Sequence, residues 1–215
     1  MNILGQSISK NSVLLGLFAV VTTGVIAGTY LSTRGLIQEN IRHAEERALL
    51  EIIPKSRHDN SMLDDIDSVA DSELLGLRET KKFYRATQNG KFVGAILPAT
   101  ARDGYTGDVD MIVGINLDGS IAGVRVLSHR ETPGLGDQVD YKKSHWVDGF
   151  IGKSLSNPET SKWAVKKDKG VFDQFTGATI TPRAVTGAVH RALLYFDANR
   201  ATITGIAPKQ EHSHE

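Results

Sequence analysis

Residues 110–127 read DMIVGINLDGSIAGVRVL, and this stretch decides the fold. Two runs rich in β-branched residues flank Asp118-Gly119, a dipeptide typical of the tight turn of a β-hairpin. Residues 83–97 are built in the same way around an Asn-Gly dipeptide. We therefore expect two hairpins that together form an antiparallel sheet of at least four strands.

Helical patterns follow the hairpins near residues 139–152 and 182–198, and a short helix is expected near residues 72–77. Strands and helices do not alternate regularly along the chain. This order predicts an α+β fold, an antiparallel sheet with flanking helices, and not a doubly wound sheet. No Gly-x-Gly-x-x-Gly motif follows a predicted strand, so the sequence indicates no dinucleotide site.

The amino-terminal part of the chain carries a membrane-anchor signal. Residues 11–33 contain no charged side chain, and Lys10 and Arg34 bracket them. A helix over residues 13–31 would span about 28 Å, close to the thickness of the bilayer hydrocarbon. A cleaved signal peptide is the alternative, but the apolar run is long and no clear cleavage site follows. We predict a tail and a single transmembrane anchor over residues 1–34.

A helical pattern continues after the anchor. Apolar residues keep helical spacing from Ile37 to Ile52, and Pro54 ends the pattern. We expect a stalk helix over residues 35–54, an α+β domain over residues 55–207 and a polar tail over residues 208–215.

Composition excludes several classes of protein. The chain has 215 residues with 25 basic and 25 acidic side chains, and its formal net charge of zero does not favour a nucleic-acid partner. It has no cysteine, which excludes disulfides and cysteine-ligated iron–sulfur clusters. The acidic residues between 59 and 73 lack the spacing and the turn glycine of a calcium loop, so we expect no metal site there.

Residues 173–182, DQFTGATITP, are the most informative stretch about function. Pro182 suits the first position of a helix, and Thr181 before it is a natural N-cap. The amino end of a helix offers unpaired N–H groups and the positive pole of its dipole, which together favour an anion. Gly177 and Ala178 would let a bulky anion approach the backbone. Ordinary helix capping remains the alternative interpretation of this stretch.

A second stretch, residues 128–137, reads SHRETPGLGD and follows the second hairpin. Its Pro-Gly and Leu-Gly dipeptides predict a sharply turning loop at the end of a strand. Loops in that position often carry binding residues on a rigid sheet. A glycine-rich connector without a binding role is the alternative.

These motifs carry a resemblance to a known family. The pattern Asp-x-x-Thr-Gly-Ala-Thr at residues 173–179 resembles the flavinylation motif of proteins that bear flavin mononucleotide (FMN) on a threonine. With Glu-Thr-Pro-Gly-Leu-Gly upstream and an amino-terminal anchor, the chain resembles the FMN-binding domain family of ion-translocating respiratory complexes. It is most similar there to the G-type subunits of Rnf electron transport complexes, which are related to the C-type subunits of sodium-translocating NADH:quinone oxidoreductases. The resemblance covers most of the chain.

The resemblance implies a role for each matching residue. Thr179 would carry the FMN covalently through a phosphoester, attached by a separate flavin transferase that recognises Asp173. The remaining cofactor-binding residues would be Glu131, Thr132, Gly134, Leu135, Thr176, Gly177, Ala178 and Thr181. Two departures from the family pattern are mild: Thr176 stands where many members have serine, and His58 stands where tyrosine is common.

The resemblance also implies a function. The chain would be a membrane-anchored flavoprotein subunit that relays electrons within an ion-translocating ferredoxin–NAD oxidoreductase complex, and not a stand-alone enzyme. Its partners would be the other membrane subunits, and its α+β domain would lie on the periplasmic side of a bacterial inner membrane. The distribution of charges around the anchor does not by itself fix this orientation. Two alternatives are an anchored scaffold that binds FMN or another phosphate ligand reversibly, and an interaction protein without a cofactor.

Overall fold

The computed structural model describes residues 3–205, so the predicted polar tail at 208–215 lies outside the described residues. The chain divides into two compact units, one up to Glu45 and the other from Glu46 onwards. The second unit contains the whole sheet and both loop motifs, residues 128–137 and 173–182. The predicted α+β class is confirmed.

Helix α1 runs from Ile3 to Ile52 without a break, so the predicted anchor and stalk patterns lie on one helix. The apolar side chains of the anchor are exposed, as expected for a helix in lipid; Leu15 is 69% exposed and Ile26 is 70% exposed. Thr22 and Thr29 donate their hydroxyls to backbone oxygens four residues earlier, each at 2.8 Å, which satisfies them without water. In the described residues, α1 is the one helix long and apolar enough to cross a membrane.

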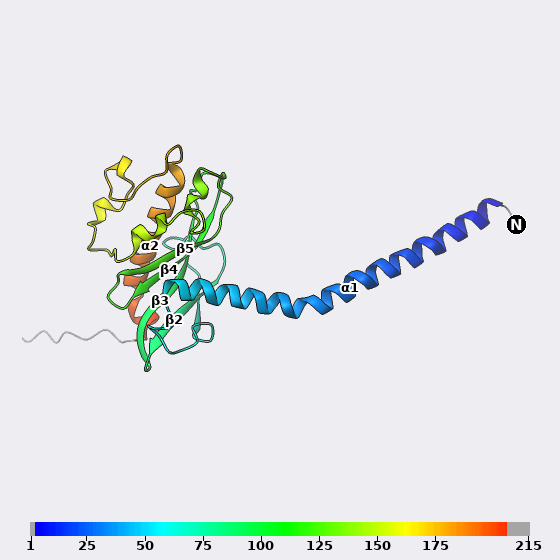
Figure 1. Cartoon of the computed structure of the whole chain (residues 1–215), viewed down its shortest axis with the longest axis horizontal. Coiled ribbons are helices and arrows are strands. Elements are labelled where there is room, and N and C mark those ends of the chain that lie inside the picture. The colour runs from blue at the N-terminus through cyan, green and yellow to red at the C-terminus, as the bar shows by residue number, and fades with distance from the viewer. Residues whose placement is uncertain (1–2, 206–215) are drawn as a thin grey trace, which may run out of the picture. The chain divides into compact units, whose positions relative to one another are not determined.

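The sheet has five antiparallel strands in the order β1-β2-β3-β4-β5 (Figure 1). The strands are β1 (Ile66–Val69), β2 (Lys81–Gln88), β3 (Lys91–Ala101), β4 (Val109–Asn116) and β5 (Ile121–Ser128). Both predicted hairpins are confirmed, β2 with β3 and β4 with β5. Gly119 has a φ of +86°, which only glycine adopts easily in a tight turn. The sequence does not predict strand β1, because its four residues lie in a polar stretch and only pairing with β2 makes them a strand.

The two faces of the sheet are covered by different helices. Helix α2 (Ile180–Ala198) packs on one face, where Val185 and Val189 belong to the same core as Leu97 of β3. The last turns of α1 pack on the other face, where Leu49 and Ile52 meet a second core. The alternation of side chains along β3 serves both cores, because successive residues point to opposite faces. A short helix, α3 (Arg200–Thr204), follows α2.

The segment between β5 and α2 contains only short 3-10 helices. These are η1 (Gly136–Val139), η2 (Trp146–Phe150), η3 (Thr160–Lys162) and η4 (Lys166–Asp168). The predicted helix over 139–152 is therefore wrong. Trp146 and Phe150 share only the short helix η2, and their rings contact each other and the rings of Phe175 and Phe172.

The predicted short helix at 72–77 is also wrong. The carboxylate of Asp71 accepts hydrogen bonds from the backbone N–H groups of Leu74 and Leu75, at 2.6 and 2.9 Å, and so forms a local turn. Gly76 then adopts a φ of +69°, which does not continue a helix. Leu75 and Leu77 are buried, so their apolar character reflects core packing.

Candidate functional site

The two sequence motifs meet around one cavity of about 250 Å³, which we call the motif cavity. The loop after β5 supplies one wall, and the start of α2 with the loop before it supplies the other. The cavity is lined by Tyr105, Glu131, Thr132, Leu135, Gly136, Gly177, Ala178, Thr179, Ile180 and Thr181. Stretches far apart in the sequence thus form a single site.

The start of α2 differs from the prediction. The helix begins at Ile180 with Thr179 at the N-cap position, and Thr179 makes no side-chain capping bond. The prediction that Thr181 is the N-cap and Pro182 the first helical residue is wrong by two positions. Thr181 is fully buried and donates its hydroxyl to Glu131, so it cannot cap the helix. Proline is tolerated within the first turn because the N–H that it lacks has no partner there.

Thr179 is therefore placed at the positive end of a long helix and is half-buried at the edge of the motif cavity. Its hydroxyl is not used for capping. The first backbone N–H groups of α2 point toward the same end of the helix, where they favour a negative group. This arrangement suits an anion bound to, or esterified with, Thr179.

Glu131 is the buried centre of the site, with only 5% of its surface exposed. One carboxylate oxygen accepts a hydrogen bond from the Thr181 hydroxyl at 2.6 Å. The other accepts from the backbone N–H and the hydroxyl of Thr106, at 3.1 and 3.2 Å. The carboxylate thus connects the loop before β4, the loop after β5 and the first turn of α2.

Two glycines of the site are required by its geometry. A Cβ on Gly136 would lie 2.6 Å from a carboxylate oxygen of Glu131 and 2.9 Å from the hydroxyl oxygen of Thr181. Gly177 has a φ of +81°, and a Cβ there would lie 3.3 Å from the Leu135 side chain. The two loops therefore approach each other too closely for larger residues at position 136, and the turn at 177 favours glycine.

No basic side chain lines the motif cavity; among its ten described residues Glu131 alone is charged. Two basic residues near the start of α2 are engaged elsewhere: Lys166 pairs with Asp173 at 2.5 Å, and Arg183 pairs with Asp168 at 2.6 Å. The hydrogen bond from Arg183 lowers the pKa of Asp168, and that carboxylate in turn raises the pKa of Arg183. An anion at Thr179 would be stabilised by the helix end and not by a salt bridge.

The structure brings most of the predicted site residues together, but three lie outside the cavity lining. Gly134, Thr176 and Asp173 are all exposed. Gly134 shapes the loop after β5, because its N–H donates to the Asp137 carboxylate at 2.8 Å. The Asp173 backbone oxygen accepts from the Trp146 ring N–H at 2.8 Å, which leaves its side chain at the surface.

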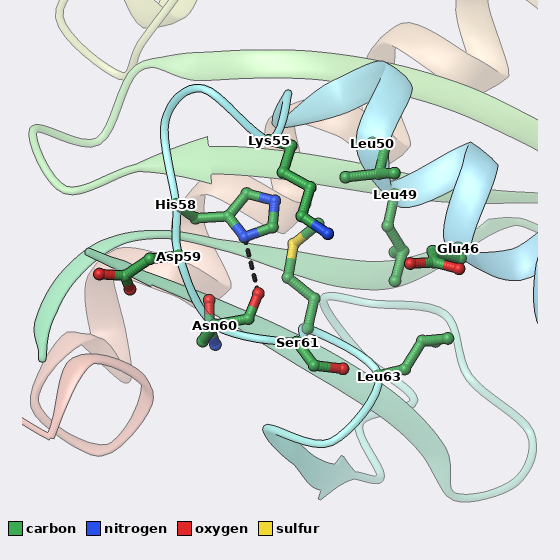
Figure 2. Close-up of a pocket in the computed structure, with 10 residues that line it drawn as sticks. Glu46, Leu49, Leu50, Lys55, His58, Asp59, Asn60, Ser61 and Leu63 are labelled. Atoms are coloured by element: carbon green, nitrogen blue, oxygen red, sulfur yellow. Dashed lines mark hydrogen bonds between the residues drawn. The ribbon is translucent and has the colours of Figure 1, made fainter. Parts of the chain in front are cut away.

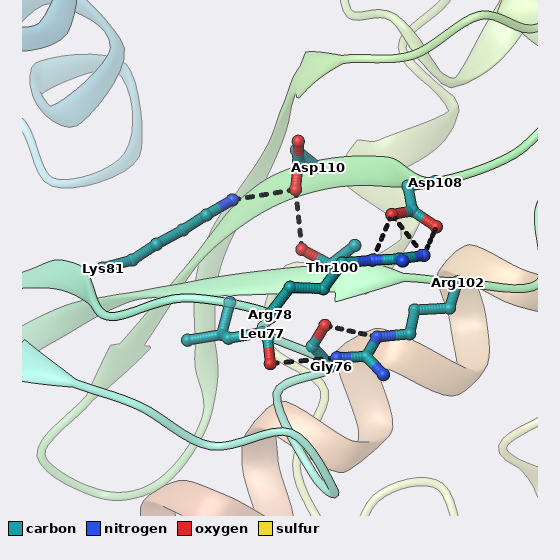
Figure 3. A network of polar contacts seen from close by, with 8 residues as sticks. All are labelled: Gly76, Leu77, Arg78, Lys81, Thr100, Arg102, Asp108 and Asp110. Carbon is teal, nitrogen blue, oxygen red and sulfur yellow. Dashed lines mark hydrogen bonds and ion pairs between the residues drawn. The ribbon is translucent and has the colours of Figure 1, made fainter.

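Sequence reasoning missed three lining residues, Tyr105, Gly136 and Ile180. Tyr105 is 67% exposed and lies in a glycine-rich loop between the hairpins, where no periodicity marks it. A network of polar contacts joins Arg102 and Asp108, on either side of Tyr105, to residues 76–78 (Figure 3). In it Arg78 pairs with Asp108 at 3.0 Å, and Lys81 pairs with Asp110 at 2.9 Å.

Asp110 in this network also accepts the Thr100 hydroxyl at 2.6 Å. Burial acts to raise the pKa of Asp110, but the hydrogen bond from Thr100 and the contact with Lys81 together hold it below the ordinary value. The network connects the start of β4 to β2 and β3.

A smaller cavity of about 190 Å³ lies against the last turns of α1 (Figure 2). His58 is 4% exposed there, and its Nδ1 donates to the Asn60 backbone oxygen at 2.9 Å. Its Nε2 is buried and has no hydrogen-bond partner in the part of the chain that the structure describes. The described residues contain no cluster of three or more histidine, aspartate or glutamate side chains that would hold a metal ion.

Comparison with known proteins places these features in a family. A family model described as "FMN-binding domain" matches residues 104–194, and one described as "RnfG N-terminal region" matches residues 1–52. The chain is 48% identical over 210 residues to the G subunit of the ion-translocating oxidoreductase complex of Pseudomonas aeruginosa UCBPP-PA14, covering 98% of this chain and 97% of that protein. It is 46% identical to the corresponding G subunits of Pseudoalteromonas atlantica, with 92% of each chain covered, and of Shewanella loihica, with 98% and 99% covered.

Proposed function

Because this chain belongs to the family of G subunits of ion-translocating oxidoreductase complexes, we propose that it is a membrane-anchored electron-carrier subunit with FMN esterified to Thr179. The observation that carries the proposal is the meeting of both motifs around one cavity at the start of α2. Thr179 lies in the lining of that cavity, and its hydroxyl is not used for capping.

The residues of the motif cavity fit the parts of FMN. Leu135 and Ile180 expose 42% and 43% of their surfaces and, with Tyr105, offer apolar contacts for a flat aromatic ring. The end of α2 offers N–H groups for the phosphate. The cavity of about 250 Å³ is smaller than the roughly 300–1,000 Å³ that encloses a whole ligand of drug size. Part of the flavin would thus stay exposed, as an electron carrier between subunits requires.

Flavin supplies the redox chemistry when it is bound, and the protein supplies position and electrostatics. Leu135, Ile180 and Tyr105 would orient the ring, and Thr132 would contact it from the loop after β5. Gly177 and Ala178 would let the phosphate approach the backbone. Glu131 and Thr181 would keep the two walls of the cavity together.

Covalent attachment would need a separate flavin transferase. A threonine hydroxyl is a weak nucleophile, and it needs a base to remove its proton. In the described structure the carboxylate of Asp173 is paired with Lys166, so it is not placed as that base. The Thr179 oxygen would displace a leaving group from the phosphorus of an activated flavin nucleotide, and the transferase would accept the proton. Asp173 is exposed and would serve in recognition by that enzyme.

We also propose that the α+β domain lies on the periplasmic side of the inner membrane, anchored by residues 1–34. Residues 55–207 would form the FMN-binding domain, and the other subunits of the complex would be its partners. A tethered flavin is not lost by dilution outside the cytoplasm, which gives the covalent bond a physical reason. Protease added to spheroplasts should digest the α+β domain if this orientation is right, and leave it intact if it is wrong.

The central experiment measures covalent flavin directly. The full chain is expressed with and without a flavin transferase, denatured and weighed by intact-mass spectrometry. We expect a mass increase of one esterified FMN only with the transferase, and no increase in Thr179→Ala. The matched control is Thr160→Ala, an exposed threonine of η3 outside both motifs, which should keep the added mass. Flavin found entirely in the supernatant after denaturation would support the reversible scaffold instead.

A further inference from the structure

Glu131 contacts residues outside both sequence motifs as well as residues within them. Its carboxylate lines the motif cavity on one side. On the other side Thr106, which it contacts, lines a separate cavity of about 410 Å³ together with His129 and Arg130. Its backbone N–H donates to the Nδ1 atom of His129 at 3.1 Å. Glu131 therefore lines the motif cavity and, through Thr106 and His129, contacts residues that line the second cavity.

The contacts of Glu131 suit an ionised carboxylate. A backbone N–H and two hydroxyls all lie within hydrogen-bond distance of it, and the 2.6 Å contact with Thr181 has the length of a charge-assisted bond. Thr181 is fully buried, and Glu131 is its hydrogen-bond acceptor. Neutral donors thus satisfy the hydrogen-bonding capacity of the buried Glu131 carboxylate.

Among the described residues, the hydrogen-bond partners of the Glu131 carboxylate are neutral, and no basic side chain lines the motif cavity. Within residues 3–205 no lysine, arginine or histidine side chain forms an ion pair with this carboxylate. Charges in a partly buried site are screened less than charges at the surface. The charge therefore acts on whatever occupies the motif cavity.

We propose that Glu131 is a positioning residue that joins the two walls of the motif cavity and lowers the reduction potential of the flavin held there. This inference rests on the proposed function. An electron that the flavin accepts from one neighbouring subunit adds negative charge to the cavity. The charge remains until the electron passes to a second subunit. A nearby carboxylate opposes that addition, so the reduced form is disfavoured.

The test of the charge uses Glu131→Gln in the full chain, loaded by co-expression with a flavin transferase. Glutamine keeps the shape: its oxygen accepts from Thr106, and its amide donates to the Thr181 oxygen. We expect redox titration to show a higher midpoint potential, with the ratio of oxidised to reduced flavin shifted about tenfold, or about 60 mV for a one-electron step. The matched control is Glu159→Gln, an exposed glutamate outside the cavity lining, which should leave the potential unchanged.

The second test concerns the role of Glu131 in connecting the two walls of the motif cavity. It uses flavin-free protein, so it does not depend on the cofactor. We expect amide hydrogen exchange to become at least about tenfold faster in Glu131→Ala at Thr106, whose N–H donates to this carboxylate, and at Ala178 and Arg183, whose N–H groups are bonded in the loop before α2 and in its first turn, because the acceptor that connects these segments is lost. Glu131→Gln should keep the exchange close to that of the wild type. This rescue by a conservative variant separates the hydrogen bonds from the charge.

Each result decides a part of the proposal. A midpoint potential in Glu131→Gln equal to that of the wild type overturns the role of the charge. Amide hydrogen exchange in Glu131→Ala equal to that of the wild type overturns the role of Glu131 in connecting the two walls. A wild-type chain that gains no flavin mass refutes the proposed function and the effect on the potential with it, whereas the exchange experiment still decides whether Glu131 joins the walls.

Discussion

The two loops of the motif cavity are held in place in different ways, although both expose most of their residues. The loop after β5 is fixed, because Glu131, Gly136 and Asp137 are buried and connected to other elements. The loop before α2, in contrast, buries only Phe175, and its polar residues Asp173 and Thr176 are exposed. The fixed loop can keep the shape of a cofactor site, whereas the exposed loop can be reached by another protein.

One buried side chain prevents the exposed loop from moving freely. Phe175 is 6% exposed, and its ring lies 5.1 Å from the ring of Trp146. The loop is thus held at one point while its polar residues remain accessible. A threonine that a separate enzyme must modify needs this combination of access and fixed position.

The largest expected effect comes from crowding the fixed loop. In Gly136→Ala, the added Cβ would lie 2.6 Å from Glu131 and must displace the carboxylate or the backbone. We expect a loss of about 2–3 kcal/mol in the free energy of unfolding, measured by urea denaturation of the flavin-free chain. A stability equal to that of the wild type would show that Gly136 does not lie this close to Glu131 and Thr181.

A slightly smaller effect is expected from the buried hydrogen bond. Thr181→Val keeps the shape of the side chain but removes the donor to Glu131, and a bond to a charged group contributes about 1.5–3 kcal/mol. We expect a loss of about 2 kcal/mol in the free energy of unfolding, measured in the same way. The matched change in the exposed loop, Thr176→Val, should stay within about 0.5 kcal/mol of the wild type. Equal losses in the two variants would remove the contrast between the loops.

Acid should destabilise the domain through His190 of α2, whose ring stacks on Trp163. Burial lowers the pKa of His190 below its ordinary value of 6.5, and nearby Arg191 adds to the shift. As the pH falls below 6.5, the unfolded chain takes up a proton that the folded chain resists, so stability falls. Above that pH both states are neutral and the effect vanishes. His190→Gln should flatten the stability profile between about pH 6.5 and 5, where acidic residues still add little.

The smallest effect on stability is expected at Asp173. Its pair with Lys166 is exposed, and exposed pairs contribute little. We expect Asp173→Asn to unfold at the same urea concentration as the wild type and yet to acquire flavin several times more slowly from the transferase. Normal flavinylation of this variant would mean that the transferase does not use Asp173. A large loss of stability would mean that this loop is structural.

Local signals in the sequence are sufficient to predict the sheet. The turn dipeptides around Gly90 and Gly119 fix both hairpins, because their backbone conformations depend mainly on the turn residues themselves. Strand β1 has no such signal, since only pairing with β2 makes it a strand. Within 139–152 the rings of Trp146 and Phe150 contact each other and rings from more distant segments, which a local pattern does not reveal.

The same distinction between local sequence signals and contacts of distant segments applies to the site. Its motif residues can be found from sequence, because two short stretches carry them. The position of Thr181 cannot, since its hydroxyl is taken by Glu131, which lies far earlier in the chain. Tyr105 and Gly136 are not predicted as lining residues for the same reason: their roles depend on contacts between distant segments.

The most direct test of the central claim locates the flavin on a single residue. Trypsin should release residues 170–183 as one peptide, which contains Thr176, Thr179 and Thr181. Fragmentation of this peptide from chain that was co-expressed with a flavin transferase should place the mass of one esterified FMN on Thr179. Flavin mass on Thr176 or Thr181, or an unmodified peptide throughout, would contradict the account.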